Sequence, residues 1–274
     1  MMNLIKSDMY RIWRGKGIYI SFALLIFFVV LTVFVFRAAA SGPAIAFMEY
    51  EPGMSEMEIS TPFQSVAYVT GSQAAQMALY NVSSVLVYIF LGIIVVVAMG
   101  GFSSGAIKND LAIGIPRGKI YLSKWMLASG LCLLLLGANL VLSVALVIPF
   151  DGLGDWGGGY VMEVAQAFLL QGLATVAVVG VGIFFAFLTK KTSATIGLFL
   201  AFMLVPAGLA QLLSIAFERA LDYMVYDLGN QLVFFASPGS LTGGEIARGV
   251  GVVVGYMVVT ALVGVALFKK AEVK

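Results

Sequence analysis

Apolar residues fill six long stretches of the chain, and polar residues gather between them. Each stretch reaches the length of about 20 residues that an α-helix needs to cross a bilayer. A helix satisfies its own backbone hydrogen bonds in lipid, so even the glycine-rich run at 249–264 is expected to be helical. The pattern predicts an all-α membrane protein whose residues 1–274 form one domain. The six transmembrane helices are expected near Ile18–Ala40, Val82–Gly101, Trp125–Ile148, Val161–Leu188, Ser193–Ala216 and Gly249–Phe268.

Ahead of the first span, apolar and basic positions interleave. The apolar residues recur at helical spacing, and they are Leu4, Ile5, Met9, Ile12 and Trp13. Lys6, Arg11 and Arg14 lie between them. This pattern predicts an amphipathic helix over residues 1–17 that lies in the membrane interface. In a simpler interpretation, the basic residues only anchor the chain at lipid headgroups.

The basic residues gather on one side of the predicted spans. Most of the 16 Lys and Arg residues precede the first span or follow the second, fourth or sixth: Lys6, Arg11, Arg14, Lys16, Lys108, Arg117, Lys119, Lys124, Lys190, Lys191, Lys269, Lys270 and Lys274. Because basic loops stay on the cytoplasmic side, both termini are expected to be cytoplasmic. The first apolar run is too long for a cleavable signal peptide, so it is expected to remain as a span.

The amino-acid composition excludes several kinds of catalytic and metal-binding site. The chain is 61% hydrophobic and 11% charged, and it has one Cys and no His. Catalytic dyads and metal sites that need histidine are therefore excluded. The stretch GIPRGK at 114–119 resembles a phosphate-binding loop, but only three residues separate its glycines and Ile120 follows the lysine. No catalytic residue, cofactor site, metal site or nucleic-acid partner is expected on this chain, and it is not expected to be an enzyme.

Polar residues inside the spans have two interpretations. They are Asn139, Gln166, Gln171 and Gln211. Hydrogen bonding between helices is the favoured interpretation, and substrate contact is the alternative. The glycine pairs Gly101/Gly105 and Gly251/Gly255 have the spacing of close helix packing. The intramembrane charges Arg37 and Glu163 lie near the outer ends of their helices, and no ion-coupling site is evident, so the chain shows no energy source of its own.

The segment after the second span reads FSSGAIKNDLAIGIPRGKIYLSK at 102–124. Its Gly105-Ala106-Ile107-Lys108-Asn109 run, followed by Gly114 and by Arg117, Ile120, Tyr121 and Lys124, resembles the cytoplasmic loop of ABC-2 type permeases. These permeases are membrane subunits of bacterial ABC exporters. The six spans, the basic amphipathic start and the long outer loop are also similar to this family. The resemblance implies a multi-pass protein of the bacterial cell membrane.

Residues 104–113 can form a short helix, in which Ile107 and Leu111 share one face and Lys108 and Asp110 lie outside it. Pro116 should disfavour helix at Ile115, and Gly114 and Gly118 should permit the turn into the third span. The resemblance implies that this segment is a coupling helix that contacts an ATPase subunit. The implied contact residues are Ile107, Lys108, Asn109, Asp110, Leu111 and Arg117. Alternatively, the basic residues only bind lipid headgroups.

The resemblance also implies partners and a substrate. An ABC ATPase would carry the ATP and magnesium, and the permease would act as a homodimer or with a related permease. Small six-span relatives export amphipathic or antimicrobial peptides such as phenol-soluble modulins and lantibiotics, so peptide export is expected. Lipid or drug export is one alternative, and a stand-alone channel or secondary transporter is an alternative of another class. A membrane enzyme is disfavoured by the lack of histidine and of clustered carboxylates.

The predicted outer loop at 41–81 carries acidic residues and no Lys or Arg. Its four glutamates are Glu49, Glu51, Glu56 and Glu58. They would attract a cationic peptide. The alternative is that basic residues are simply excluded from the outer side.

Overall fold

A computed structural model describes residues 2–41, 70–217, 226–237, 239 and 241–270 of the chain. All regular elements in this described part are helical, and two of them are short π-helices, labelled η. The elements are α1 (Met2–Arg14), α2 (Lys16–Ser41), α3 (Gly71–Asn81), η1 (Val82–Leu86), α4 (Val87–Ile94), η2 (Val95–Met99), α5 (Gly100–Ser103), α6 (Ala106–Ala112), α7 (Arg117–Asp151), α8 (Tyr160–Thr189), α9 (Thr192–Phe217), α10 (Leu228–Phe234) and α11 (Gly243–Lys270).

Five stretches in the described part of the chain are long and apolar enough to cross a membrane. They are Lys16–Val35, Gly71–Ser103, Arg117–Asp151, Tyr160–Thr189 and Gly243–Lys270. The length and composition of these helices therefore support the prediction of an all-helical, multi-pass membrane protein. The predicted span at Ser193–Ala216 falls on α9, where only the shorter apolar stretch Thr192–Pro206 is recognised. The count of six spans stays a prediction.

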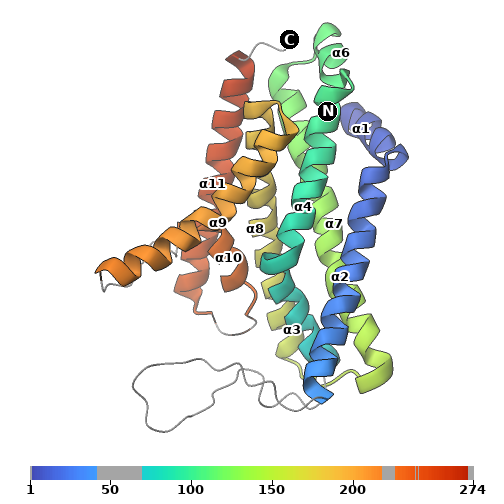
Figure 1. Cartoon of the computed structure of the whole chain (residues 1–274), viewed down its shortest axis with the longest axis vertical. Coiled ribbons are helices and arrows are strands. Elements are labelled where there is room, and N and C mark those ends of the chain that lie inside the picture. The colour runs from blue at the N-terminus through green and yellow to red at the C-terminus, as the bar shows by residue number, and fades with distance from the viewer. Residues whose placement is uncertain (1, 42–69, 218–225, 238, 240, 271–274) are drawn as a thin grey trace.

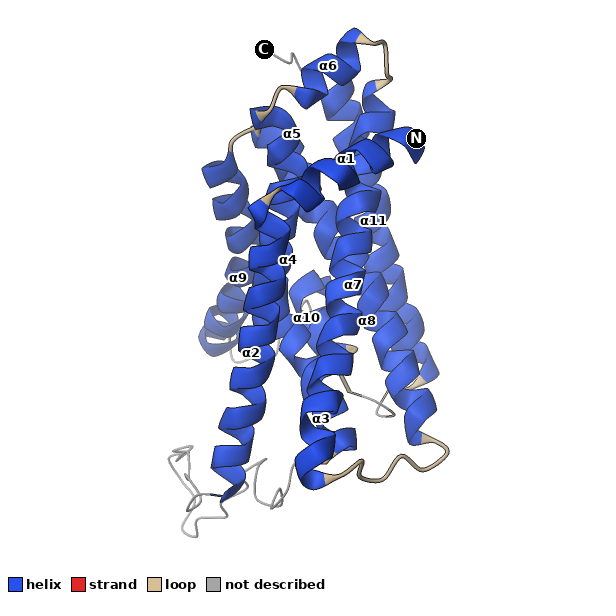
Figure 2. Ribbon diagram, turned by 90° about the vertical axis from the view of Figure 1, so that its right-hand side faces the viewer, coloured by secondary structure: helices blue, strands red, loops and turns tan. Residues whose placement is uncertain are grey.

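The long helices form an elongated bundle, and α9 diverges from it (Figure 1). We call the end that holds α6, α1 and the last turn of α11 the α6 end (Figures 1 and 2). The helix α1 lies across the bundle at a steep angle to α2 (Figure 2). Ile12 is buried on its inner side, whereas Trp13 is 57% exposed. The helix predicted for residues 1–17 thus exists over Met2–Arg14, and its membrane contact stays a prediction.

Two helices are longer than the sequence pattern suggested. The second predicted span begins at Val82, but the helical stretch begins at Gly71. Residues 71–81 lack a long apolar run, yet Ala74, Ala75 and Ala78 are buried there because small side chains allow close packing. Helix α7 begins at Arg117 instead of Trp125. The basic residues of its first two turns made that segment look like a loop, although charge does not prevent a helix from starting outside the lipid.

Two buried polar side chains donate hydrogen bonds to backbone carbonyls of neighbouring helices. At the junction of α3 and η1, the Asn139 side-chain amide donates to the Ala78 carbonyl at 2.8 Å. The Gln171 amide donates to the carbonyls of Leu79 at 2.8 Å and Leu232 at 3.0 Å. The favoured interpretation, hydrogen bonding between helices, is confirmed for these two residues.

Replacing Gln171 by leucine should destabilise the bundle by about 1–3 kcal/mol, because two interhelical hydrogen bonds are lost and two carbonyls lose a donor. Thermal unfolding of the purified protein in detergent measures the change. Gln166→Leu is the matched control, since Gln166 is on the same helix but exposed. Equal melting temperatures for the two variants would contradict this role of Gln171.

At the end opposite α6, Arg37 forms an ion pair. Its guanidinium lies 3.4 Å from the Asp151 carboxylate and stacks over the Phe150 ring at 4.6 Å. Glu163 has a different neighbour, because a Cβ atom added to Gly239 would approach its carboxylate to 2.5 Å. Arg37 is therefore paired with Asp151, and these contacts connect α2 to the last residues of α7.

Candidate functional site

The loop that resembles a coupling segment contains a helix at the α6 end of the bundle (Figure 1). Its helix, α6, covers Ala106–Ala112, which is shorter than the predicted 104–113. Gly105 precedes it with φ +69°, a left-handed conformation that favours glycine. Gly114 follows it with φ +86°, as a turn residue. Gly118 is not part of this turn; it lies in the first turn of α7 and faces Val265.

The inner face of α6 is fixed by apolar packing. Ile107 is only 1% exposed. Its side chain lies against Gly101, where an added Cβ would come within 3.2 Å of the Ile107 Cδ1 atom. Gly101 therefore allows the Ile107 side chain to approach the backbone closely. Gly105 has a different role, because an added Cβ would meet nothing within 4 Å; its left-handed backbone is the reason for glycine there.

The outer face of α6 is available for contact. Lys108, Asn109 and Ala112 are exposed, and Ile113 directly after the helix is 79% exposed. Asp110 and Leu111 are half-buried. Of the predicted ATPase-contacting residues, Lys108 and Asn109 are thus presented outward, whereas Ile107 points into the protein. The exposed Ile113 was not among the predicted contacts, although an isoleucine beside a turn glycine was a signal in the sequence.

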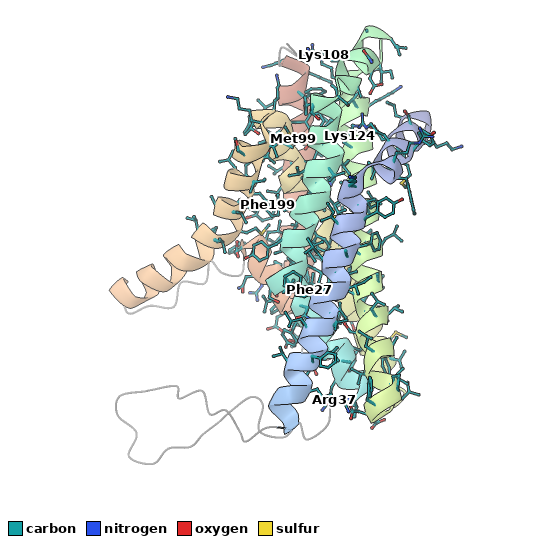
Figure 3. The ribbon with its side chains drawn as sticks, turned by 45° about the vertical axis from the view of Figure 1, so that its right-hand side comes forward. Phe27, Arg37, Met99, Lys108, Lys124 and Phe199 are labelled. Carbon is teal, nitrogen blue, oxygen red and sulfur yellow. The ribbon has the colours of Figure 1, made fainter. Side chains whose placement is uncertain are left out.

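A buried ion pair joins α1 to α7 beneath this helix. The Lys124 ammonium lies 2.6 Å from the Asp8 carboxylate, and the two side chains are 1% and 7% exposed. Figure 3 shows Lys124 near the crossing of α1 with the bundle and Lys108 farther out. Sequence reasoning missed this pair. The available signal was Asp8, the one acidic residue within the basic residues 2–14.

Arg11 extends the pair toward α6. One guanidinium nitrogen donates to Asp8 at 3.0 Å and the other donates to the Ser104 hydroxyl at 3.2 Å. Ser104 in turn donates to the Gly100 carbonyl at 2.6 Å. We call Asp8, Arg11, Ser104 and Lys124 the α1 junction. Through it, α1, the segment before α6 and the start of α7 are held together by charge-assisted hydrogen bonds.

The pKa of Asp110 on α6 depends on its partial burial and on the charges of this junction. Partial burial, and secondarily the Asp8 carboxylate, raise the pKa of Asp110 above the ordinary value of 3.8. Within the window between the ordinary and the raised pKa, the folded protein binds more protons than the unfolded chain. This contribution to stability is therefore present at low pH and lost as pH rises through the window.

Asp110→Asn should flatten the pH dependence of stability in the acidic range and modestly raise stability near neutrality. The reason is that asparagine removes a carboxylate that is partly desolvated and near Asp8. Melting temperatures recorded in detergent from the ordinary carboxyl range up to neutral pH measure the effect. Asp155→Asn, an exposed carboxylate at the opposite end, is the control. A steeper pH dependence in Asp110→Asn would refute the assignment.

Arg117 contacts the end of α11. Its guanidinium donates to the carbonyls of Phe268 at 3.2 Å and Lys269 at 3.1 Å. The last carbonyls of a helix lack partners within the helix, so Arg117 caps α11 and its charge favours that helix terminus. The role of Arg117 within the chain is therefore structural, which adds to its predicted part in partner binding.

The other predicted site residues are the four glutamates of the outer loop and the glycine pair on α11. Glu49, Glu51, Glu56 and Glu58 lie outside the described residues. Gly251 and Gly255 are exposed on α11, and Cβ atoms added to them would meet nothing within 4 Å. These two glycines do not pack against the described part of the chain, so any close packing there needs another molecule. The described residues contain no group of three or more His, Cys, Asp or Glu side chains that could hold a metal ion.

Comparisons with protein families and with curated proteins gave no match for this chain. The assignment of function therefore rests on the membrane-type helices, the α1 junction and the exposed face of α6.

Proposed function

We propose that the chain is the transmembrane permease subunit of an ATP-driven exporter and that α6 is the coupling helix that contacts a separate ATPase. The observation that carries this proposal is the arrangement of α6. Its inner face is anchored by Ile107 and lies beside the α1 junction, and its outer face presents Lys108, Asn109 and Ile113. A helix that transmits movement of an ATPase to the membrane domain needs both a rigid attachment to that domain and an accessible contact surface.

The proposed energy source is ATP hydrolysis by the partner ATPase subunit. The ATPase would bind ATP and magnesium, and its movement against α6 would be passed to α1 and α7 through the α1 junction. Two copies of the permease, or one copy with a related permease, would present two such helices to two ATPase subunits. The α6 end is then cytoplasmic, as the distribution of basic residues predicts.

The proposed substrate is an amphipathic or antimicrobial peptide, with lipid or drug export as the alternative. Vesicles that contain the permease and its ATPase should accumulate a fluorescent amphipathic peptide only when ATP is hydrolysed. An ATPase variant that binds but does not hydrolyse ATP is the control. Peptide movement without the ATPase would favour a channel or secondary transporter, and lipid flipping without peptide movement would favour lipid export.

The neighbouring reading frame offers an independent check. An ATPase with a complete G-x-x-x-x-G-K-[ST] motif encoded beside this chain would support the proposal, because the permease has no such motif of its own. Its protein product would also be the first partner to use in reconstitution.

A further inference from the structure

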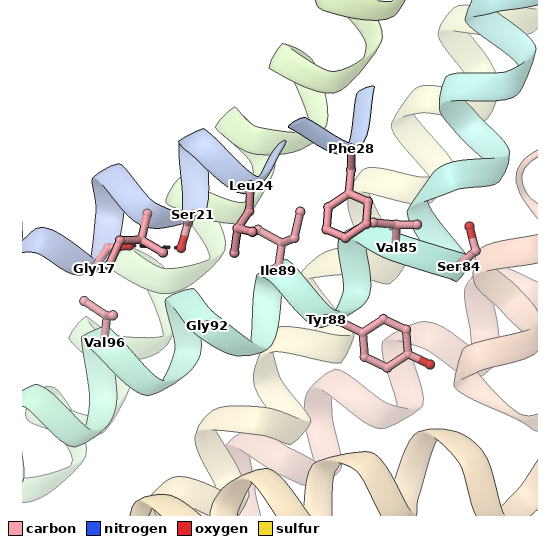
Figure 4. A pocket seen from close by; sticks show the side chains of 11 residues that line it. Gly17, Ser21, Leu24, Phe28, Ser84, Val85, Tyr88, Ile89, Gly92 and Val96 are labelled. Carbon is pink, nitrogen blue, oxygen red and sulfur yellow. Dashed lines mark hydrogen bonds between the residues drawn. The ribbon is translucent and has the colours of Figure 1, made fainter. Parts of the chain in front are cut away.

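A groove of about 500 Å³ lies between α2 and the stretch from η1 to η2. Figure 4 shows its walls, with Gly17, Ser21, Leu24 and Phe28 on one side and Val85 and Val96 among the residues on the other. None of the lining residues is charged. Ile20, Leu24 and Tyr88 are 58%, 43% and 42% exposed, so the groove opens onto the outer surface of the bundle.

The shape of the groove follows from helix packing. At its α6 end the helices touch, because a Cβ atom added to Gly17 would lie 2.5 Å from the Val96 side chain. Farther along, a Cβ added to Gly92 would lie 3.6 Å from the Ser21 hydroxyl, which is an ordinary van der Waals distance. The π-helices contribute residues at both ends, Val85 from η1 and Val96 from η2. Such π segments are rare and frequently occur at functional sites.

The dimensions suit one extended hydrocarbon chain. From Gly17 to Phe28 the groove follows α2 over about 16 Å at 1.5 Å per residue. This length matches one leaflet, about half of the roughly 30 Å hydrocarbon core. A peptide helix is about 10–12 Å wide, so roughly one turn of it would occupy the whole volume. The groove therefore cannot enclose more than about one turn of a helical peptide, and it is long enough for an acyl chain.

The polar groups at the groove favour the same ligand. The buried Ser21 hydroxyl donates to the Gly17 carbonyl at 3.1 Å, so its proton is already used within α2. The exposed Lys16 precedes Gly17 at the α6 end, and the exposed Arg14 ends α1 nearby. Lys16 is therefore adjacent in sequence to the groove residue Gly17. The guanidinium of Arg14, two residues before Lys16, lies over the Tyr10 ring of α1 at 4.6 Å. Cationic side chains at the surface attract anionic lipids.

We propose that this groove binds an anionic phospholipid from the leaflet on the α6 side, with one acyl chain between α2 and α4 and the headgroup near Arg14 and Lys16. The site requires that α2 lies in the bilayer with its basic end at the headgroups. It does not require an ATPase or a peptide substrate, so its test is independent of the proposed export.

The test uses the purified full chain in phosphatidylcholine vesicles that contain phosphatidylglycerol with a photoreactive group on its acyl chain. After irradiation, mass spectrometry of peptides should locate the label within residues 17–28 and 84–96. Leu24→Trp should reduce this labelling to the background found on α11, because the indole fills the groove. Leu31→Trp is the matched control, since Leu31 is on the same helix, is 44% exposed and does not line the groove.

A second arm tests the headgroup. Replacing Arg14 and Lys16 by glutamine should lower labelling by phosphatidylglycerol about fivefold per residue, and should leave labelling by photoreactive phosphatidylcholine unchanged. Lys108→Gln, at the far tip of the α6 end, is the control. Labels spread evenly over α2 and α11, equal effects of the two tryptophan variants, or preferential labelling of the groove by a photoreactive amphipathic peptide would each overturn the proposal.

Discussion

Lys124→Met should destabilise the protein by about 3–5 kcal/mol, which is the usual cost of removing one partner of a buried ion pair. The substitution leaves the Asp8 carboxylate buried with Arg11 as its remaining cation, and Arg11 is itself 32% exposed at the side chain. Within the described residues, one Asp8 carboxylate oxygen already lacks a hydrogen-bond partner, so the site has little capacity to compensate. Thermal unfolding in detergent and the rate of proteolysis between α1 and α2 measure the loss.

The double variant Asp8→Asn/Lys124→Met separates a charge effect from a packing effect. Removing both charges should recover most of the lost stability, because no uncompensated buried charge remains. Lys119→Met is the control for removing a lysine in the first turns of α7, since Lys119 is exposed. If Lys124→Met behaves like Lys119→Met, the α1 junction does not hold α1 in place and the proposed route from α6 to α1 is wrong.

The pair of substitutions Lys108→Glu and Ile113→Asp should weaken association with the proposed partner ATPase at least about tenfold. Truncating a hot-spot residue of an interface costs about 2 kcal/mol or more, which corresponds to roughly a thirtyfold change in affinity. Both side chains are exposed, so the fold should change in stability by no more than about 0.5 kcal/mol. Co-purification with the proposed ATPase from membranes, and stimulation of its ATP hydrolysis by this chain, measure the effect.

The control for this experiment is Lys119→Glu, which makes the same charge change at an exposed position on α7 instead of α6. Unchanged co-purification of the Lys108/Ile113 variant would contradict the proposed coupling role of α6. Arg117→Glu is a less informative variant, because it removes the cap on α11 as well as any partner contact. A loss of binding in that variant would not distinguish these causes.

The sequence predicted the helices better than the contacts among them. Long apolar runs located the spans because a bilayer demands about 20 apolar residues, whatever they pack against. The same reasoning missed residues 71–81 and the first turns of α7, where helix formation depends on tertiary packing rather than on lipid. The family resemblance grouped Ile107 with Lys108 as contact residues, although Ile107 is buried and Lys108 is exposed.

The candidate site likewise combines features that the sequence predicted with contacts that it did not predict. Gly114 and Pro116 mark the turn after α6 in the sequence itself, since each restricts the backbone locally. The pairing of Asp8 with Lys124 joins residues 116 positions apart, and no local pattern identifies such a pair. Asn139 and Gln171 were recognisable as polar residues inside the spans, but their acceptors, the carbonyls of Ala78, Leu79 and Leu232, were not.

The sequence by itself determined that this chain is a helical membrane protein, where its apolar helices lie and which segment turns between two of them. These properties depend on the solvent and on short-range backbone geometry, both of which act residue by residue. Only the tertiary structure decided that α1 is fastened to α7, that α6 presents Lys108 and Ile113 outward, and that a groove opens beside α4. Those features come from side chains that meet across the bundle, where burial decides whether a charge is paired, exposed or excluded.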